Sequence, residues 1–295
     1  MSDIKNEFQR TDLHMHTVCS DGTDTPSGII AAVRAAGIDL FSVTDHDSSE
    51  SGALITAALA PGDPAFINGI EFSCRDDGGK YHILGYGFDI AGSEVEKAAS
   101  YAHEMRRVKT EARIVHLKEK YGFVFSPNDI RALFANYNPG KPHLARLLVK
   151  RGYARDTAQA FGYLSGIKCG GRFLSPEEAI RAILDSHGIP VLAHGVFGDG
   201  DQTLTDEETE SRVKRLKECG LMGLEGFYSG FSARESALTV SLARKYGLLV
   251  TAGSDYHGGN KSVRLGDIGA GVTADPETLR PFCKATLEAG MIIRK

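Results

Sequence analysis

The chain has 295 residues and a formal net charge of −4, and its hydrophobic fraction of 42% and charged fraction of 24% are ordinary for a globular protein. No apolar run is long enough to span a membrane, and the N-terminus lacks the apolar segment of a signal peptide, so we expect a cytoplasmic protein without membrane contact. The five cysteines are scattered and form no CxxC pair, which argues against a disulfide framework and a zinc knuckle.

Short apolar runs alternate with helical patterns along most of the chain, which is typical of parallel βαβ units. Most of these runs are continuous, as expected for strands that are buried on both faces. The predicted strands are residues 10–15, 39–44, 65–72, 81–86, 190–194, 221–227 and 248–253. Seven such strands predict an α/β fold with a closed barrel.

Capping residues mark several predicted helices between these strands. Thr25 precedes Pro26, a favoured first helical residue, and the SPEE segment at 175–178 forms a capping box. Further helices are predicted at 206–219 and 233–246, and each ends near a glycine.

The middle of the chain breaks this alternation. Apolar residues recur at helical spacing from about residue 94 to 120. No predicted strand separates this helix from the next ones, which are expected at 126–135, 142–151 and 156–164. We therefore predict an all-helical insertion between two barrel strands.

The predicted insertion is strongly basic. Residues 97–170 contain fourteen Lys and Arg against five Asp and Glu, a local charge of +9. Such asymmetry is typical of a segment that meets an anion, although a solvated basic surface explains the charge alone equally well. We expect a discontinuous barrel formed by residues 1–96 and 171–295, with the insertion at 97–170 acting as a lid over its mouth.

Metal-ligating side chains follow two predicted strands in pairs. His14 and His16 lie two residues apart in an extended run, so both imidazoles project from one face, and Asp255 and His257 repeat this spacing. A lone histidine is more often a core or surface residue than a ligand. Two such pairs at strand ends favour a metal site instead.

Other candidate ligands lie in similar positions. Glu71 ends an apolar run, where a buried carboxylate needs an ion pair or a metal. Asp21 lies in a Ser-Asp-Gly turn, and turn chemistry alone would explain it. His46, His82 and His194 lie in or directly after predicted strands, so they could converge with the two pairs.

These motifs (DxHxH, TDH, Glu, His, His and SDxH, in this order from residue 10 to about 270) resemble those of the polymerase and histidinol phosphatase (PHP) family of metal-dependent phosphoesterases. The resemblance implies a distorted (βα)7 barrel that holds three divalent metal ions. It places one ion on His14, His16, Glu71 and Asp255. It places a second ion on Glu71, His82 and His194, and a third on Asp21, His46 and His257.

The chemistry implied by three such ions is hydrolysis by a metal-bound hydroxide, so no catalytic side chain is predicted. Some family members have histidine in place of Asp21, and the added oxygen ligand lets manganese, iron or magnesium compete with zinc. Asp12 lies two residues before His14, and Asp45 directly precedes His46. Both could orient ligand imidazoles, although ordinary structural hydrogen bonding is as good an explanation.

The substrate must be inferred from the predicted insertion. Its GKPHLAR segment at 140–146 resembles the Gly-Arg/Lys-Pro-His segment of a PHP subgroup that carries a helical insertion and acts on small nucleotides. Lys141 and His143 are candidate contacts for a second phosphate near a helix start. Arg113 is a further candidate on the long helix, although a solvated stripe explains its spacing better.

Three functions remain open. The first is a phosphatase that hydrolyses a monoester of a small nucleotide, such as a nucleoside 3′,5′-bisphosphate or monophosphate, and the basic insertion favours it. The second is a phosphodiesterase that acts on a small cyclic phosphate or an RNA 5′ end. The third is a non-catalytic metal-binding PHP module, which the complete set of nine ligands and the lack of a polymerase segment after residue 295 argue against. We expect a small phosphorylated partner, with short RNA as the alternative and no obligate protein partner.

Overall fold

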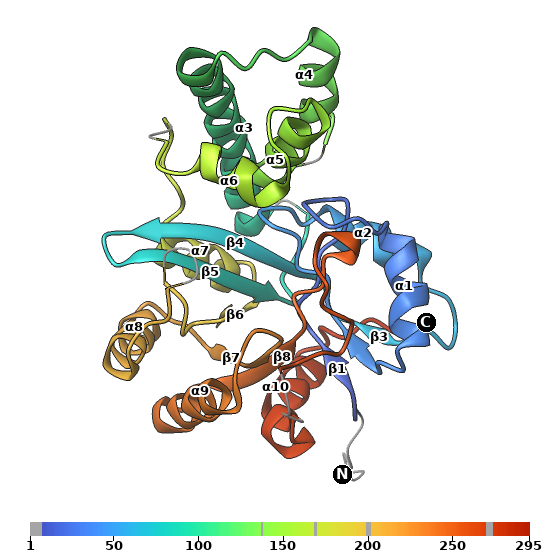
Figure 1. The fold of residues 1–295 in the computed structure, drawn as a ribbon. Coiled ribbons are helices and arrows are strands. Elements are labelled where there is room, and N and C mark those ends of the chain that lie inside the picture. The colour runs from blue at the N-terminus through green and yellow to red at the C-terminus, as the bar shows by residue number, and fades with distance from the viewer. Residues whose placement is uncertain (1–7, 92, 137, 168–169, 199–201, 270–273) are drawn as a thin grey trace.

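The computed structural model describes residues 8–295 except residues 92, 137, 168–169, 199–201 and 270–273. It has a mixed α/β fold with two sheets (Figure 1). The smaller sheet contains β1 (Thr11–Asp12), β2 (Leu40–Phe41) and β3 (Ala65–Phe66) in that order, and both of its pairings are parallel. The larger sheet contains, in order, β4 (Gly69–Asp76), β5 (Gly79–Tyr86), β6 (Ile189–Leu192), β7 (Gly223–Tyr228) and β8 (Leu249–Gly253).

The smaller sheet contacts both edge strands of the larger sheet, β8 and β4. The Leu13 amide donates to the carbonyl of Ala252 in β8 at 2.9 Å, and His46 forms an isolated bridge with Glu71 in β4. The segments that follow β1 and β2 are therefore held against the first and last strands of the larger sheet. These segments carry four of the predicted metal ligands, which are His14, His16, Asp21 and His46.

The expectation of parallel strands throughout is wrong for β5, which is antiparallel to both β4 and β6. A two-residue turn, Asp77-Gly78, connects β4 to β5. Asp-Gly is a strong signal for a tight hairpin, and a hairpin can connect only antiparallel strands.

The predicted strand at 65–72 is also wrong, because it divides between the two sheets after Phe66. The Asn68 side chain donates to the Phe88 carbonyl at 2.8 Å. A Cβ atom on Gly69 would lie 2.4 Å from Ser42 Oγ, so only glycine fits where β4 passes the segment after β2. Glu71 consequently lies within β4 and does not end a strand.

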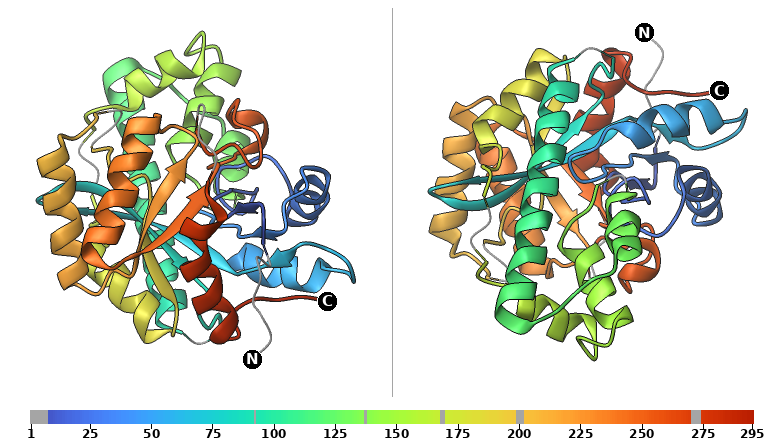
Figure 2. Two further views of the ribbon diagram at one scale, coloured as in Figure 1. Left: turned by 90° about the horizontal axis from the view of Figure 1, so that it is seen from below. Right: turned by 90° about the horizontal axis from the view of Figure 1, so that it is seen from above.

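Helices cover the outer faces of both sheets (Figure 2). α1 (Pro26–Ala35) and α2 (Glu50–Ala58) pack on the smaller sheet through a cluster that includes Ile29, Ile55 and Phe66. The second half of the chain forms α7 (Pro176–Asp185), α8 (Asp206–Glu218), α9 (Ala233–Tyr246) and α10 (Pro276–Glu288), and a short 3-10 turn η1 spans Gly258–Asn260.

The predicted caps are confirmed. Thr25 Oγ1 accepts from the Gly28 amide at 3.1 Å, and Pro26 begins α1. Ser175 and Glu178 form a reciprocal capping box at the start of α7. Local side-chain chemistry thus fixes where these helices begin.

Four consecutive helices lie together above the β4–β5 hairpin (Figure 1). They are α3 (Glu94–Tyr121), α4 (Pro127–Phe134), α5 (Lys141–Lys150) and α6 (Thr157–Leu164). They share a buried apolar cluster that includes Leu117, Leu133, Leu144 and Leu148. None of the helices in the described part of the chain is long and apolar enough to cross a membrane.

Candidate metal centre

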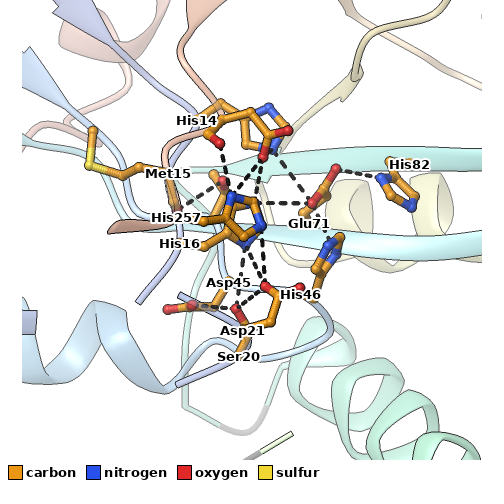
Figure 3. Close-up of polar contacts among 12 residues, drawn as sticks. His14, Met15, His16, Ser20, Asp21, Asp45, His46, Glu71, His82 and His257 are labelled. Atoms are coloured by element: carbon orange, nitrogen blue, oxygen red, sulfur yellow. Dashed lines mark hydrogen bonds and ion pairs between the residues drawn. The ribbon is translucent and has the colours of Figure 1, made fainter. Parts of the chain in front are cut away.

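The predicted ligands gather where the two sheets meet (Figure 3). They come from the segments that follow β1, β2, β6 and β8 and from the adjacent strands β4 and β5. His194 is a correction, since β6 ends at Leu192 and His194 lies in the turn that follows. The ligands from the smaller sheet are His14, His16, Asp21 and His46, and those from the larger sheet are Glu71, His82, His194, Asp255 and His257.

Glu71 lies at the centre of the group. Its side chain is 1% exposed, and its two carboxylate oxygens face different histidines. Oε1 lies 2.7 Å from His82 Nδ1 and 3.3 Å from His194 Nε2. Oε2 lies 2.9–3.5 Å from nitrogens of His14, His16 and His46. One carboxylate is therefore shared between two sets of imidazoles.

Asp255 and Asp21 extend the group on either side of His16. Asp255 Oδ1 lies 3.2 Å from His16 Nε2 and 3.5 Å from His14 Nε2. Asp21 Oδ1 lies 3.3 Å from His257 Nε2 and 3.8 Å from His16 Nδ1. His16 thus lies between the two carboxylates and faces both.

The donor atoms fit divalent cations. Three groups each bring their ligand atoms within 4.8 Å of one another: His16 with Asp21, His46 and His257; His14 with His16 and Asp255; and His46 with Glu71 and His82. His14 Nε2, His16 Nε2, His46 Nδ1 and Glu71 Oε2 are buried and make no hydrogen bond. A buried polar atom without a partner is costly, and coordination of a cation would satisfy all four.

The charges in the group stabilise one another despite burial. Burial disfavours the ionised form of Glu71, but the nearby His46, His82 and His14 hold the pKa of this carboxyl well below its usual range. Burial also opposes protonation of His16, yet the nearby carboxylates of Asp255 and Glu71 raise its pKa to about 9. The three carboxylates are therefore ionised and attract positive charge at neutral pH.

Asp12 and Asp45 hold the chain segments that carry the ligands. Asp45 accepts from the Thr17 amide at 2.8 Å and from Ser20 Oγ at 2.6 Å. Asp12 accepts from the amides of Ser254 and Gly266 at 2.9 and 2.8 Å. The hydrogen bonds described here run from main-chain amides and hydroxyls to these two carboxylates.

Glu225 in β7 is a residue that the sequence analysis missed. Its Oε1 lies 2.9 Å from His14 Nδ1, and its Oε2 accepts from the His194 main-chain amide at 2.8 Å. Glu225 is fully buried, and His194 has a φ of 31°. The carboxylate therefore directs His14 Nε2 toward Glu71 and fixes a turn with an unusual backbone conformation. The signal was available, since Glu225 is a charged residue within an apolar strand, as Glu71 is.

Asp255 has a comparable support. Its Oδ2 accepts from the Tyr228 hydroxyl at 3.0 Å and from Lys261 Nζ at 2.6 Å. The two donors occupy this oxygen, which leaves Oδ1 turned toward His14 and His16.

The α3–α6 helices meet the group at Asp21 and His46. Asn138 Nδ2 donates to the carbonyl of His46. His143 in α5 is buried, and burial together with Arg146 lowers its pKa to about 4, while Asp21 and the Ser20 main chain act in the opposite direction. Of the other predicted substrate contacts, Lys141 is half-buried at the start of α5 and Arg113 is half-buried on α3.

No model of a protein family matches the sequence. The chain is similar to a phosphoribosyl 1,2-cyclic phosphate 1,2-diphosphodiesterase of Eggerthella lenta, with 30% identity over 84% of this chain and 94% of the relative. It is 29% identical to a 3′,5′-nucleoside bisphosphate phosphatase of Chromobacterium violaceum, over 92% of this chain and 93% of that one. A crystal structure from Bifidobacterium adolescentis, described as that of an inferred metal-dependent phosphoesterase, superposes with a TM-score of 0.78 and 27% identity, over 94% of this chain and 96% of that chain.

Proposed function

Because the chain belongs to the PHP family of metal-dependent phosphoesterases, we propose that it hydrolyses a phosphate monoester of a small phosphorylated nucleotide, either a nucleoside 3′,5′-bisphosphate or a monophosphate. The protein is a metal-dependent hydrolase of phosphoric esters. The observation that carries metal-dependent hydrolysis is the carboxylate of Glu71, whose two oxygens face separate sets of imidazole nitrogens. The similarity to a 3′,5′-nucleoside bisphosphate phosphatase supports the monoester.

The proposed cofactors are three divalent ions, which are manganese, iron or zinc, with magnesium as a further option. His14, His16, Glu71 and Asp255 would hold the first ion. The contacts of Glu71 support its role as a shared ligand, because Oε1 faces the residues assigned to the second ion. Oε2 faces His14 and His16, and also His46 of the third site. His82 and His194 would complete that second site, and Asp21, His46 and His257 would hold the third.

Divalent ions bound in this way supply Lewis acidity and a nucleophile at neutral pH. The contribution of the protein is to hold the ligands in one arrangement and to keep them ionised. Glu225 fixes the direction of the His14 ring, and Tyr228 with Lys261 fixes the Asp255 carboxylate. Since these contacts are made before substrate binds, little reorganisation is needed during the reaction.

The proposed architecture is a distorted (βα)7 barrel formed by residues 1–96 and 171–295, with residues 97–170 as an inserted helical lid. The contacts between the sheets at Leu13 and at His46 support closure of the barrel. The separate apolar cluster of α3–α6 supports the insertion. We place the enzyme in the cytoplasm.

The proposed lid contacts the substrate through Lys141, His143 and Arg113. Its support is the position of His143, which lies close enough to Asp21 for this carboxylate to raise the pKa of His143, although burial lowers that pKa more. Burial keeps His143 neutral at pH 7, so it would act as a hydrogen-bonding group and Lys141 and Arg113 would bring the positive charge.

A second candidate function is hydrolysis of a phosphodiester. The observation that favours it is the similarity to the Eggerthella lenta enzyme, whose name states that it cleaves a cyclic phosphate diester. A monoester and a diester require the same bound ions, so the cluster alone does not separate the two reactions.

The experiment that tests the proposal is phosphate release by manganese-reconstituted protein. The panel contains nucleoside monophosphates, 3′,5′-bisphosphates, cyclic phosphates, 5′-phosphorylated RNA and histidinol phosphate. We expect the highest kcat/KM for a small nucleotide monoester, and a higher value for a cyclic or internucleotide ester would replace this proposal by the second one. Protein that retains its metal ions yet hydrolyses no ester would contradict both.

A further inference from the structure

A cavity of about 470 Å³ opens beside the metal-ligand group, on the side of the larger sheet. His82, His194 and Asp255 line its inner end, and the rings of Phe197 and Tyr228 form part of its wall. Its volume lies within the roughly 300–1,000 Å³ that is usual for small-molecule sites. A phosphate ester held by the ligand group therefore has room for its organic part in this cavity, with the leaving oxygen at the inner end.

Lys261 lies at this inner end. It lines the cavity, and its Nζ is 2.6 Å from Asp255 Oδ2. Its side chain is 40% exposed, so a bound molecule can reach the ammonium group. An ammonium group carries three N–H donors. The contact with Asp255 uses one of them, and the other two are able to donate to a substrate.

The turn directly before Lys261 is tied to the chain segment that carries Asp21. Asn260 Nδ2 donates to the Asp21 main-chain carbonyl at 2.6 Å. Gly258 has a φ of 62°, and a Cβ atom at this position would collide with Thr23 Oγ1, so only glycine fits there. The main chain leading to Lys261 is therefore fixed against the ligand group, which limits the positions that its Nζ can reach.

Lys261 shares its acceptor with Tyr228, but the two donors differ in charge. The Tyr228 hydroxyl donates its one proton to Asp255 Oδ2 at 3.0 Å and so holds the carboxylate without adding charge. Lys261 adds a positive charge beside residues that would bind divalent cations, and like charges repel one another. A support for Asp255 alone is better made by a neutral donor. An anion bound next to Lys261 would offset the cost of its charge.

Ester hydrolysis produces negative charge at this place. A bond forms from a water oxygen to phosphorus, and the bond from phosphorus to the ester oxygen breaks, so its electron pair stays with the leaving group. Because the transition state of phosphoryl transfer is loose, much of this charge is already on the leaving oxygen at the barrier. A hydrogen bond from an ammonium group is stronger to a charged oxygen than to a neutral one. It therefore stabilises the transition state more than the bound substrate.

We propose that Lys261 is a catalytic residue that donates a hydrogen bond to the leaving oxygen of the substrate ester. The inference rests on the proposed function, because it takes ester hydrolysis at the ligand group as the reaction, and it adds a catalytic side chain where the sequence predicted none. The ammonium group keeps its protons, and the leaving oxygen takes its proton from the attacking water. Lys141, His143 and Arg113 would contact a part of the substrate outside this cavity.

The test compares variants of the two donors in the manganese-reconstituted protein. Lys261→Met removes the charge and keeps an unbranched side chain, whereas Lys261→Arg keeps the charge. Tyr228→Phe is the matched comparison, because it removes the other donor to Asp255 Oδ2. Lys97→Met is the neutral control, since Lys97 is an exposed lysine that pairs with Glu94 on α3. The substrates are phenyl phosphate and 4-nitrophenyl phosphate, which are similar in shape, but nitrophenolate is the far better leaving group.

We expect Lys261→Met to lower kcat/KM for phenyl phosphate about ten- to hundredfold, the effect of losing one charge-assisted hydrogen bond, and for 4-nitrophenyl phosphate less than about threefold. Lys261→Arg should recover part of the loss. Tyr228→Phe should change both esters by the same factor, and Lys97→Met should match the wild type. Equal losses on both esters in Lys261→Met would overturn the proposal.

Manganese binding without any ester gives a second readout. Lys261→Met removes a positive charge beside the ligands, so calorimetry should show manganese binding at least as tight as in the wild type. Weaker binding in this variant, with full activity on both esters at saturating manganese, would show that Lys261 only supports Asp255. That result would also overturn the proposal.

Failure of the proposed function would look different. Wild-type protein that hydrolyses the phenyl esters but no nucleotide would contradict the proposed substrate, and the ratio between the two esters would still decide the role of Lys261. If the wild type hydrolyses only diesters, the phenyl and 4-nitrophenyl esters of thymidine 5′-phosphate give the same comparison. Metal-loaded protein that hydrolyses neither pair would overturn the role of Lys261 as well.

Discussion

The ligand group at the sheet junction and the four helices above it differ in the kind of side chain that they bury. In the first region, buried and partly buried histidines and carboxylates face one another, and four of their polar atoms have no hydrogen-bond partner. In the second, charged residues lie mostly at the surface around a small core of leucine and alanine. The side chains of the first region match what bound cations require, and the second region leaves most of its charge at the surface.

The comparison shows where each kind of information is held. Coordination chemistry restricts the first region to a few residue types at fixed positions, so its motifs identify the reaction. Phosphate and sugar recognition can be met by many arrangements of Lys, Arg and aromatic side chains. The sequence of the helices therefore indicates charge but does not identify a ligand.

The largest expected effect is that of Glu71→Gln. The amide replaces an ionised oxygen by a donor, so one of the two imidazole sets would face an NH2 group instead of a shared charge. We expect kcat/KM to fall more than about a hundredfold, since mutation of residues that only orient metal ligands already lowers metal affinity or activity about 10- to 100-fold. Mass spectrometry of bound metal should show fewer ions per chain. Glu235→Gln, in the capping box of α9, is the control and should retain full metal content.

His194→Ala extends this test to the outer side of Glu71. It removes the imidazole that faces Oε1 at 3.3 Å and should likewise abolish most activity and part of the bound metal. Full activity in either variant would refute the ligand assignment and with it the contrast between the two regions.

Several parts of this arrangement could be predicted from the sequence. His14 with His16 and Asp255 with His257 were identifiable because pairs two residues apart in an extended chain point to one side. All the predicted helices are present, because their caps and apolar spacing are local signals. The positions of most strands were also predictable, but the run at 65–72 belongs to two strands, and the assignment to one parallel set was not correct.

The missed features depend on contacts between distant segments. Gly69 is required where β4 passes Ser42, and only the fold brings these residues together. Local signals were also overlooked: Asp77-Gly78 marks the hairpin, and Asn68-Gly69 marks the break within a continuous apolar run. Glu225 could be suspected as a buried charge, but its two partners could not be identified, since both lie far from it in the chain.

Leu148→Ala tests whether the four helices fold independently of the ligand group. Leu148 is fully buried in the shared core of α3–α6, so we expect a loss of about 2–5 kcal/mol in the free energy of unfolding of these helices. Bound metal should be unchanged if the helices have a core of their own. Val115→Ala in α3 is the control. Val115 is exposed, so its substitution should lower the free energy of unfolding by less than about 0.5 kcal/mol. Denaturant titration followed by circular dichroism, with metal analysis, measures both quantities. Loss of metal in Leu148→Ala would show that the regions fold as one unit.

A smaller effect concerns the contact between the two regions. Burial lowers the pKa of His143 to about 4 from the usual 6.5, so between these values the unfolded chain binds a proton that the folded chain does not. Stability is therefore full above pH 6.5 and falls as the pH decreases toward 4, by about 3 kcal/mol for 2.5 pKa units. His143→Gln should remove this part of the slope in denaturant titrations with chelator present. His187→Gln, which replaces an exposed histidine, should retain it.

The smallest expected effect sharpens the account of the ligand group. One oxygen of Glu225 contacts His14 Nδ1, and the other accepts a hydrogen bond from the His194 main-chain amide. Glu225→Gln must therefore turn an NH2 group toward one of these two nitrogens. We expect a 10- to 100-fold loss of metal affinity, with the ions still bound at high concentration, because Glu225 orients ligands without being one. Asp89→Asn is a matched control, since Asp89 makes an equally short contact with His187 at the surface, 2.8 Å from its Nδ1. If Glu225→Gln binds metal as tightly as Asp89→Asn does, the orientation of His14 must come from packing of its ring instead. Glu225 would be established as a positioning residue if the variant binds metal more weakly but recovers catalysis at saturating metal concentration.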